Sequence, residues 1–351
     1  MLGCIQRVVV RVTIATAVLL AIASGCGGSS RSSTQTAPER DLPPQALEFR
    51  AEGWRTDFTR RHVPLSEFLS GGPPRDGIPP IDSPRLLAVD KVDFVRPNEP
   101  VIELSVNGRT RGYPIQILIW HEIVNDTIAG VPVAVTFCPL CNTALVFDRR
   151  LDDDVLDFGT TGKLRHSDLV MYDRQTESWW QQFGGEGLVG EHAGARLDRI
   201  PARIVAWREF ATQHPNALVL SRQTGYNRPY GANPYEGYDD IDSSPLFPVA
   251  NEDDERLPPK ERVVFIERGN DAVVVPYSVL EQRRAVRVRV GGDRLVVRFR
   301  HGPVSALDQA AIAESRDVGA AEVLHGARLV EFEEPFWFVV AAFRPDVRIV
   351  R

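Results

Sequence analysis

The sequence predicts a β-rich α+β fold, with mixed or antiparallel sheets and few helices. Two observations predict it. From about Phe49 onward the apolar runs are short, rich in Val, Ile, Phe, Tyr and Trp, and bounded by turn residues, which is typical of strands. Few segments, in contrast, repeat apolar residues at helical spacing. Because 351 residues with 43% hydrophobic content can bury a full-sized core, we expect a single large domain over residues 49–351.

Composition and period assign the individual elements. We expect helices at the apolar segment 115–124, at 207–215 and at 306–316. The expected strands, in chain order, are residues 100–106, 131–137, 143–148, 168–173 and 178–183. Strands therefore outnumber helices, and we expect the sheets to form most of the core.

Part of the chain has a second, degenerate copy 162 residues further on. Residues 97–145 and 259–307 align without a gap and share eleven identical positions, whereas about three are expected from average composition. We therefore expect a tandem duplication of a strand–helix–strand unit. The second copy replaces His121, Cys138 and Cys141, so one copy carries the reactive side chains and the other supports it.

The N-terminus predicts export and lipid attachment. Residues 1–25 place Arg7 and Arg11 before an uncharged apolar stretch and then small residues, which is the order of a secretory signal. The apolar stretch is too short for a comfortable membrane span. The tetrapeptide Ala-Ser-Gly-Cys resembles a bacterial lipobox, so Cys26 is the predicted lipidation site. Ordinary signal cleavage nearby, or an uncleaved anchor, is the alternative.

A polar segment follows the predicted signal. Residues 26–48 are rich in Ser, Gly and Pro and have no apolar period, which predicts a flexible tether. Together these features predict a protein of the cell envelope, lipid-anchored to a membrane on the extracytoplasmic face. The formal net charge of −6, without a run of basic residues, argues against nucleic acid as a partner. Small molecules, metals and proteins remain.

The motif Cys-Pro-Leu-Cys places Cys138 and Cys141 at the end of a predicted strand. Once the signal is removed and Cys26 is modified, they are the only free cysteines of the chain. As a metal clasp, the pair supplies two soft ligands for copper or zinc. As a redox pair, it makes the protein a thiol–disulfide oxidoreductase of the envelope. As an inert disulfide, it is only a structural cross-link in a non-catalytic interaction module.

A metal site needs further ligands from distant positions. The histidine candidates are His121 and His166, and the carboxylate candidates are Asp168, Asp173 and Glu177. Sulfur combined with imidazole suits zinc or cuprous copper and discriminates against magnesium and calcium. Spacing alone does not choose among these five residues.

Residues 221–247 form a long segment without helical or strand period. So long an irregular segment inside a compact domain is uncommon and is usually functional or disordered. Its aromatic content favours order. Its tyrosines either cover an exposed sheet edge or line a pocket; they are Tyr226, Tyr230, Tyr235 and Tyr238.

Several long motifs resemble the bacterial and archaeal family known as domain of unknown function 3179. The resemblance runs from about Asp76 to beyond Val275 and is carried by YPIQILIWHEIVNDTIAGVPVAVTFCPLCNTALVFDR, SDLVMYDRQTESWWQQ and LVLSRQTGYNRPYGANPYEGYDDID. It implies an exported, often lipid-anchored protein. It also implies that the cysteine pair and the tyrosine-rich segment belong to one signature.

The resemblance also bears on the choice of metal ligand. His121 lies inside the motif WHEIVND, which fits the family pattern, so it is the preferred third ligand beside Cys138 and Cys141. Asp173 or Glu177 is then expected to orient the metal ligands without binding the ion itself. The sequence thus predicts a copper or zinc site, with a redox pair and a structural disulfide as alternatives.

Overall fold

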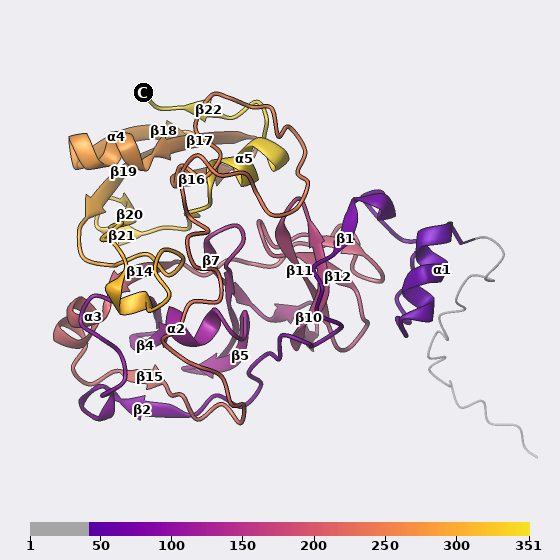
Figure 1. Ribbon diagram of the computed structural model, residues 1–351, viewed down its shortest axis with the longest axis horizontal. Helices are drawn as coiled ribbons and strands as arrows, with labels where there is room; N and C mark the ends of the chain where they lie inside the picture. Colours follow the sequence, from indigo (N-terminus) through magenta and orange to yellow (C-terminus); the bar gives the residue numbers. More distant parts are fainter. Residues whose placement is uncertain (1–41) are drawn as a thin grey trace, which may run out of the picture. The chain divides into compact units, whose positions relative to one another are not determined.

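The computed structural model describes residues 42–351, which belong to one compact unit (Figure 1). Strands hold 38% of the residues and helices 14%, which confirms the β-rich prediction. The predicted signal and the lipidation site Cys26 lie outside the described residues. No helix within residues 42–351 combines the length and the apolar character that a membrane span needs.

The described chain begins with a packed helix. In α1, Ala46 and Phe49 are buried, and Phe49 packs against Trp179 with ring centroids 4.9 Å apart. The end of the predicted tether is therefore folded, because these apolar side chains find partners in the core. The first elements are α1 (Pro44–Ala51), η2 (Leu65–Glu67), β1 (Phe68–Ser70), β2 (Leu86–Ala88) and η3 (Val89–Lys91).

A first structural segment then contains two antiparallel hairpins joined by a short helix. Its strands at 100–106 and 143–148 have the predicted bounds. The strands β5, β6 and β7 form one antiparallel sheet, and β3 and β4 belong to the sheet β14-β3-β4-β15-β2. The elements are β3 (Pro100–Val106), β4 (Arg109–Pro114), α2 (Ile115–Leu118), β5 (Ile123–Ile128), β6 (Val131–Cys138) and β7 (Thr143–Asp148).

The helix predicted at 115–124 is wrong beyond Leu118. Glu122 adopts a left-handed conformation, with φ of 59°, and its N–H donates to the Leu118 carbonyl. A left-handed residue ends a helix, so the chain turns and continues as β5. The remaining apolar residues therefore belong to a buried strand.

An inserted antiparallel sheet, β1-β10-β11-β12-β13, covers part of this segment. Asn125 of β5 donates to the Phe158 carbonyl at 2.8 Å and accepts from the Phe158 N–H at 3.0 Å. The predicted strand at 168–173 has the predicted bounds. The inserted elements are β8 (Arg150–Leu151), β9 (Asp154–Val155), β10 (Phe158–Arg165), β11 (Asp168–Asp173), β12 (Trp179–Gln181) and β13 (Gly187–Val189).

The first segment closes with a strand, a helix and a short strand. The predicted helix at 207–215 is confirmed as α3, and β14 pairs with β3. Residues 221–262, which follow, contain no helix or strand. The closing elements are β14 (Ala202–Ala206), α3 (Trp207–Gln213) and β15 (Leu218–Leu220).

A second segment completes the chain. The helix predicted at 306–316 is wrong, since that stretch holds only the short η4. The Arg316 N–H donates to the Asp308 carboxylate, and the Gln309 N–H donates to the Ser315 hydroxyl. Such bonds between side chains and the backbone compete with helix formation. The elements are β16 (Val263–Arg268), β17 (Asp271–Pro276), α4 (Tyr277–Arg283), β18 (Ala285–Val290), β19 (Asp293–Arg300), η4 (Ile312–Glu314), β20 (Ala320–His325), β21 (Arg328–Leu329), α5 (Trp337–Phe343) and β22 (Arg348–Ile349).

The two segments share their element order. The strands β17, β18 and β19 begin and end 162 residues after β4, β5 and β6. Their backbone hydrogen bonds also correspond: the Phe137 N–H donates to Glu122, and the Phe299 N–H donates to Arg284. The helices α3 and α5 also correspond, although not at this offset. Each begins at a tryptophan whose N–H donates to a glutamate carbonyl, Trp207 to Glu99 and Trp337 to Glu261.

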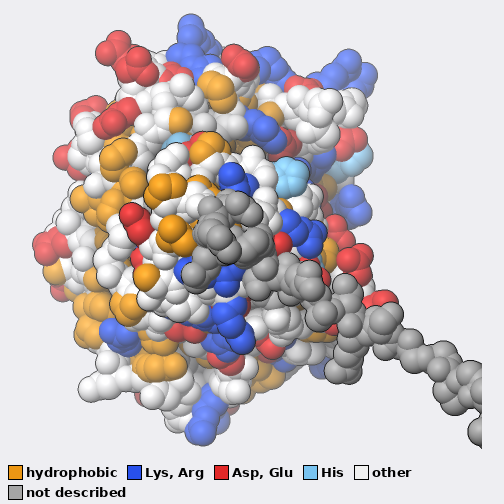
Figure 2. All heavy atoms as spheres, turned by 90° about the vertical axis from the view of Figure 1, so that its right-hand side faces the viewer, with side chains coloured by type: hydrophobic (Ala, Val, Ile, Leu, Met, Phe, Trp, Pro, Cys, Tyr) orange, Lys and Arg blue, Asp and Glu red, His pale blue; other side chains and the backbone are white. Residues whose placement is uncertain are grey.

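The main hydrophobic core spans both segments, and a second core lies between the sheets of the second segment. On the side of the molecule where α1 lies, basic and acidic side chains are interspersed (Figure 2). The cysteine pair lies within the main core.

Candidate functional site

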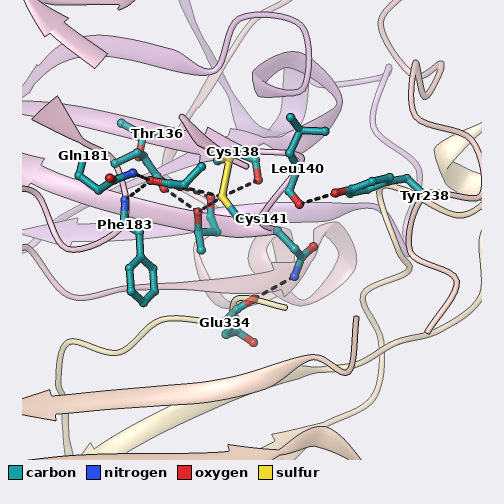
Figure 3. Close-up of a disulfide and its surroundings, with 12 residues drawn as sticks. Thr136, Cys138, Leu140, Cys141, Gln181, Phe183, Tyr238 and Glu334 are labelled. Atoms are coloured by element: carbon teal, nitrogen blue, oxygen red, sulfur yellow. Dashed lines mark hydrogen bonds between the residues drawn. A yellow bond between two sulfur atoms is a disulfide. The ribbon is translucent and has the colours of Figure 1, made fainter. Parts of the chain in front are cut away.

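The cysteine pair forms a disulfide at the turn between β6 and β7 (Figure 3). The Cα atoms of Cys138 and Cys141 are 5.6 Å apart. The turn closes because Asn142 adopts a left-handed conformation, with φ of 57°, which asparagine tolerates better than most residues. Cys138 is 1% exposed and Cys141 is 0% exposed, so a partner must displace part of the protein to reach either sulfur.

The second segment holds this turn in place. The Phe336 N–H donates to the Cys141 carbonyl at 3.1 Å. The Asn142 side-chain amide donates to the Glu334 carbonyl at 3.0 Å. Residues more than 190 positions away in sequence therefore fix the geometry of the disulfide loop.

Asp168, the first residue of β11, lies against the disulfide. Its Oδ1 is 2.8 Å from the Cys141 Sγ. Its Oδ2 accepts hydrogen bonds from the Phe183 N–H, at 2.9 Å, and from the Gln181 side-chain amide. Burial raises the pKa of Asp168 to about 7, because a carboxylate removed from water favours its neutral form. This carboxyl group therefore changes its charge near neutral pH.

A chain of hydrogen bonds orients the second polar neighbour of Cys141. Thr136 donates its only hydroxyl hydrogen to the Leu145 carbonyl, at 2.9 Å. The Gln182 amide nitrogen must then donate to Thr136, at 2.8 Å, and its oxygen must accept from Thr143, at 2.6 Å. The Thr143 oxygen, 3.1 Å from the Cys141 Sγ, has no hydrogen left. It can only accept.

The Cys141 sulfur thus faces two side-chain oxygen atoms that act as acceptors whenever Asp168 is ionised. A thiol suits this environment because its S–H is a donor. A disulfide sulfur has no hydrogen, so its contact with Asp168 is favourable only when that carboxyl group carries a proton. The protonation of Asp168 is therefore linked to the redox state of Cys141.

The same atoms could hold a metal ion. Within residues 42–351, the Sγ atoms of Cys138 and Cys141 and a carboxylate oxygen of Asp168 lie within 4.8 Å of one another. Two thiolates and one carboxylate suit a soft or borderline ion. The site can therefore accept a metal only when the disulfide is reduced.

His121, the preferred third ligand, does not belong to this group. Its Nδ1 is 2.7 Å from the Pro79 carbonyl, and its Nε2 is 2.6 Å from the Tyr230 hydroxyl. Both ring nitrogens therefore have partners other than the sulfurs. Asp168, one of the candidate carboxylates in the sequence, occupies the position expected of His121. His166 also lies elsewhere, with its Nδ1 accepting from the Ala250 N–H.

The residues expected to orient the ligands do not contact the cysteines. Asp173 accepts from the Trp180 indole N–H at 2.9 Å and from the Thr176 hydroxyl at 2.8 Å. Glu177 binds the guanidinium groups of Arg55 and Arg75. Both carboxylates stabilise the turn after β11, which is a structural role.

Two further buried acids lie near the site, and sequence reasoning missed both. Burial, together with the negative charge of Asp168, raises the pKa of Glu122 to about 8. Burial also raises the pKa of Glu333 to about 7, although Arg199 forms an ion pair with it. The only signal for Glu122 was its position beside His121 in WHEIVND. The site is therefore surrounded by carboxyl groups that resist ionisation.

The tyrosine-rich segment packs over the cysteine turn and His121. The Tyr238 hydroxyl donates to the Leu140 carbonyl, between the two cysteines, at 2.9 Å (Figure 3). The Tyr235 ring lies 6.4 Å from the Tyr238 ring. The rings of Tyr226 and Tyr230 lie 5.5 Å and 5.7 Å from the His121 ring. The segment therefore forms a cover on this part of the molecule.

Comparison with known proteins finds one related family. A family model described as "Protein of unknown function (DUF3179)" matches residues 75–347. No curated protein and no solved structure matches the chain.

Proposed function

The chain belongs to the DUF3179 family, and from that premise we propose that it is a thiol–disulfide redox protein. Cys138 and Cys141 alternate between disulfide and dithiol, and Asp168 holds the proton that accompanies the change. The observation that carries the proposal is the distance of 2.8 Å between the Asp168 Oδ1 and the Cys141 Sγ. An acid that needs a proton beside a disulfide, and can lose it beside a thiol, is suited to this exchange.

The exchange needs a partner dithiol, which supplies two electrons. A partner thiolate attacks the Cys138 sulfur, the disulfide bond breaks, and Cys141 leaves as a thiolate that takes the proton of Asp168. The second partner thiolate then attacks the mixed disulfide and releases Cys138. The partner ends as a disulfide. Of the two protons that its thiols release, one ends on Cys138 and the other returns to Asp168 or to solvent.

The pH dependence of the midpoint potential tests the proposal. Reduction of a disulfide to two thiols takes up two protons with two electrons, which changes the potential by about 59 mV per pH unit. Just below pH 7, Asp168 is protonated beside the disulfide and gives up its proton beside the dithiol, so the net uptake falls to one. We expect a slope of about 30 mV per pH unit there, and about 59 mV in Asp168→Asn.

The titration is performed in glutathione or dithiothreitol redox buffers that contain a chelator, and the thiols are counted by alkylation and mass. Asp173→Asn is the matched control, because Asp173 does not contact the cysteines, and it should keep the native slope. A native slope of about 59 mV at every pH would remove Asp168 from the reaction. A disulfide that these buffers leave intact in the folded protein would exclude the redox function.

A soft metal ion is the second candidate, favoured by the proximity of three donor atoms. We infer that copper or zinc would bind Cys138, Cys141 and Asp168 in the reduced protein, with no role for His121. Binding of zinc to reduced protein under anaerobic conditions should then be lost in Cys138→Ser and retained in His121→Gln. Equal binding by the native protein and Cys138→Ser would contradict the metal site.

The localisation belongs to the same proposal. We propose an envelope protein anchored to a membrane by a lipid on Cys26, since a disulfide persists in an oxidising compartment. In Cys26→Ser the protein should leave the membrane fraction, provided that export continues. Retention in that fraction without acylation would contradict the lipid anchor.

We also infer that the two structural segments arose by tandem duplication. The support is the common offset of three consecutive strands and the matching backbone hydrogen bonds. An experimental structure in which the two segments fail to superpose would reject this inference.

A further inference from the structure

The outer face of the hairpin β18–β19 carries an array of arginines. Arginine alternates with valine in β18, so Arg287 and Arg289 point to one face while the valines are buried on the other. In the strand register Arg289 lies opposite Arg294, and Arg298 lies on the same face. All four side chains are exposed. We call these four residues the arginine face.

The charge of the arginine face is largely unbalanced. Within residues 42–351, no carboxylate lies within 4.0 Å of the guanidinium groups of Arg287, Arg289 or Arg294, and Arg298 has one distant partner, Glu322, at 3.6 Å. Arg348 adds a further positive charge, because its guanidinium donates to the Arg289 carbonyl at 2.8 Å. The face is therefore strongly positive in a chain whose net charge is −6.

The corresponding face of the first segment is covered. Asn125 and Thr136 occupy the positions of Arg287 and Arg298, 162 residues earlier. Both are buried: Asn125 bonds to Phe158 of β10, and Thr136 bonds to Gln182, which follows β12. The inserted sheet thus covers this face in one segment, whereas in the described part of the other segment the arginines are exposed.

We propose that the arginine face docks on the anionic headgroups of a phospholipid membrane. A sheet face presents its side chains as a flat array, spaced about 7 Å along a strand and about 5 Å between strands, which matches a planar layer of phosphates. Guanidinium groups bind phosphate oxygens in a bidentate manner. Each cation held at an anionic membrane surface also strengthens binding electrostatically.

Two other anionic partners fit the face less well. Protein interfaces usually centre on buried aromatic or apolar anchors, and single-stranded nucleic acid is usually held by aromatic side chains that stack on its bases. The large exposed apolar side chains of the described residues all lie on other elements: Leu47, Val155, Leu218, Tyr226, Ile241 and Leu246. The arginine face offers charge without an apolar anchor, which favours headgroups.

Flotation with lipid vesicles tests the proposal. The full chain with Cys26→Ser, which takes no acyl group, is mixed with neutral phosphatidylcholine vesicles or with vesicles that contain phosphatidylglycerol. We expect tighter binding to the anionic vesicles, weakened by added salt. The triple variant Arg287→Gln, Arg289→Gln and Arg294→Gln should lose this preference, with binding on the order of 100-fold weaker.

Two matched variants separate the arginine face from net charge and from folding. The triple variant Arg60→Gln, Arg109→Gln and Arg208→Gln removes the same charge from exposed positions on other elements, and should bind like the parent chain. Lysine at positions 287, 289 and 294 should restore most of the binding. Circular dichroism checks that each variant is folded, as expected for exposed side chains.

Three results would overturn the proposal. The first is equal binding of the parent chain to neutral and anionic vesicles. The second is an equal loss in both glutamine triple variants, which would mean that only net charge matters. The third is failure to bind anionic vesicles together with binding to polyglutamate through the arginine face, which would identify an acidic protein as the partner.

Discussion

Asp168→Asn is expected to make the folded protein more stable than the native form at pH 8, by up to about 4 kcal/mol. Burial raises the pKa of Asp168 from 3.8 to about 7, and each tenfold change in proton affinity is worth about 1.4 kcal/mol. The folded state thus holds the proton more tightly than the unfolded state. The contribution of Asp168 to the free energy of unfolding is fully present below about pH 4, is lost as the pH rises to 7, and stays absent above that.

Asparagine fits this position without a change of shape. Its oxygen can still accept from the Phe183 N–H and the Gln181 amide, and its amide group can donate toward the Cys141 sulfur. The variant carries no charge at any pH, so it avoids the cost that the native carboxylate meets above pH 7. Its stability should therefore change less between pH 4 and pH 8, apart from the contributions of Glu122 and Glu333.

Urea denaturation at pH 5 and pH 8, without reductant, measures the difference between the two proteins. Asp254→Asn is a control of opposite sign, since a hydrogen bond from Arg256 lowers the pKa of Asp254. That variant should be slightly less stable than the native protein at pH 8. If Asp168→Asn is also the less stable form at pH 8, the buried carboxylate contributes favourable interactions in its charged form, and its assignment as a proton carrier fails.

Trp179→Ala is expected to reduce the free energy of unfolding by about 3–5 kcal/mol. The Trp179 side chain is fully buried. Four aromatic rings surround it with centroids 4.9–5.4 Å away, those of Phe49, Trp54, Phe58 and Phe68. Alanine removes the indole and leaves a cavity that these rings can fill only in part, so both transfer energy and packing are lost.

The loss of stability in Trp179→Ala should be largest where α1 and the residues after it pack on the inserted sheet. Hydrogen exchange and limited proteolysis are expected to show residues 44–70 opening first, before global unfolding. Leu246→Ala is the matched control, because Leu246 is 61% exposed and its loss should change the urea midpoint little. An unchanged midpoint in Trp179→Ala would mean that the N-terminal residues add no stability to the core.

Local sequence patterns were sufficient for the five strands predicted and for one helix, whereas the other strands of the described residues were not predicted. Residues 100–106 and 143–148 are short runs of strand-forming residues bounded by turns, and they form strands with those bounds. The segment 115–124 failed because a left-handed Glu122 redirects apolar residues into a strand. Apolar runs of this length are compatible with either a helix or a strand, and packing decides between them.

The sequence by itself determined the cysteine pair, the offset between the two segments, and the tyrosine-rich segment, whose place over the pair came from the structure. Only the tertiary structure showed that Asp168 reaches Cys141 while His121 bonds to Pro79 and Tyr230. It alone also showed that one sheet face is covered and its counterpart presents arginines. The physical reason is that periodicity specifies which way a side chain points from its own strand, whereas its neighbours come from elements far away in the chain.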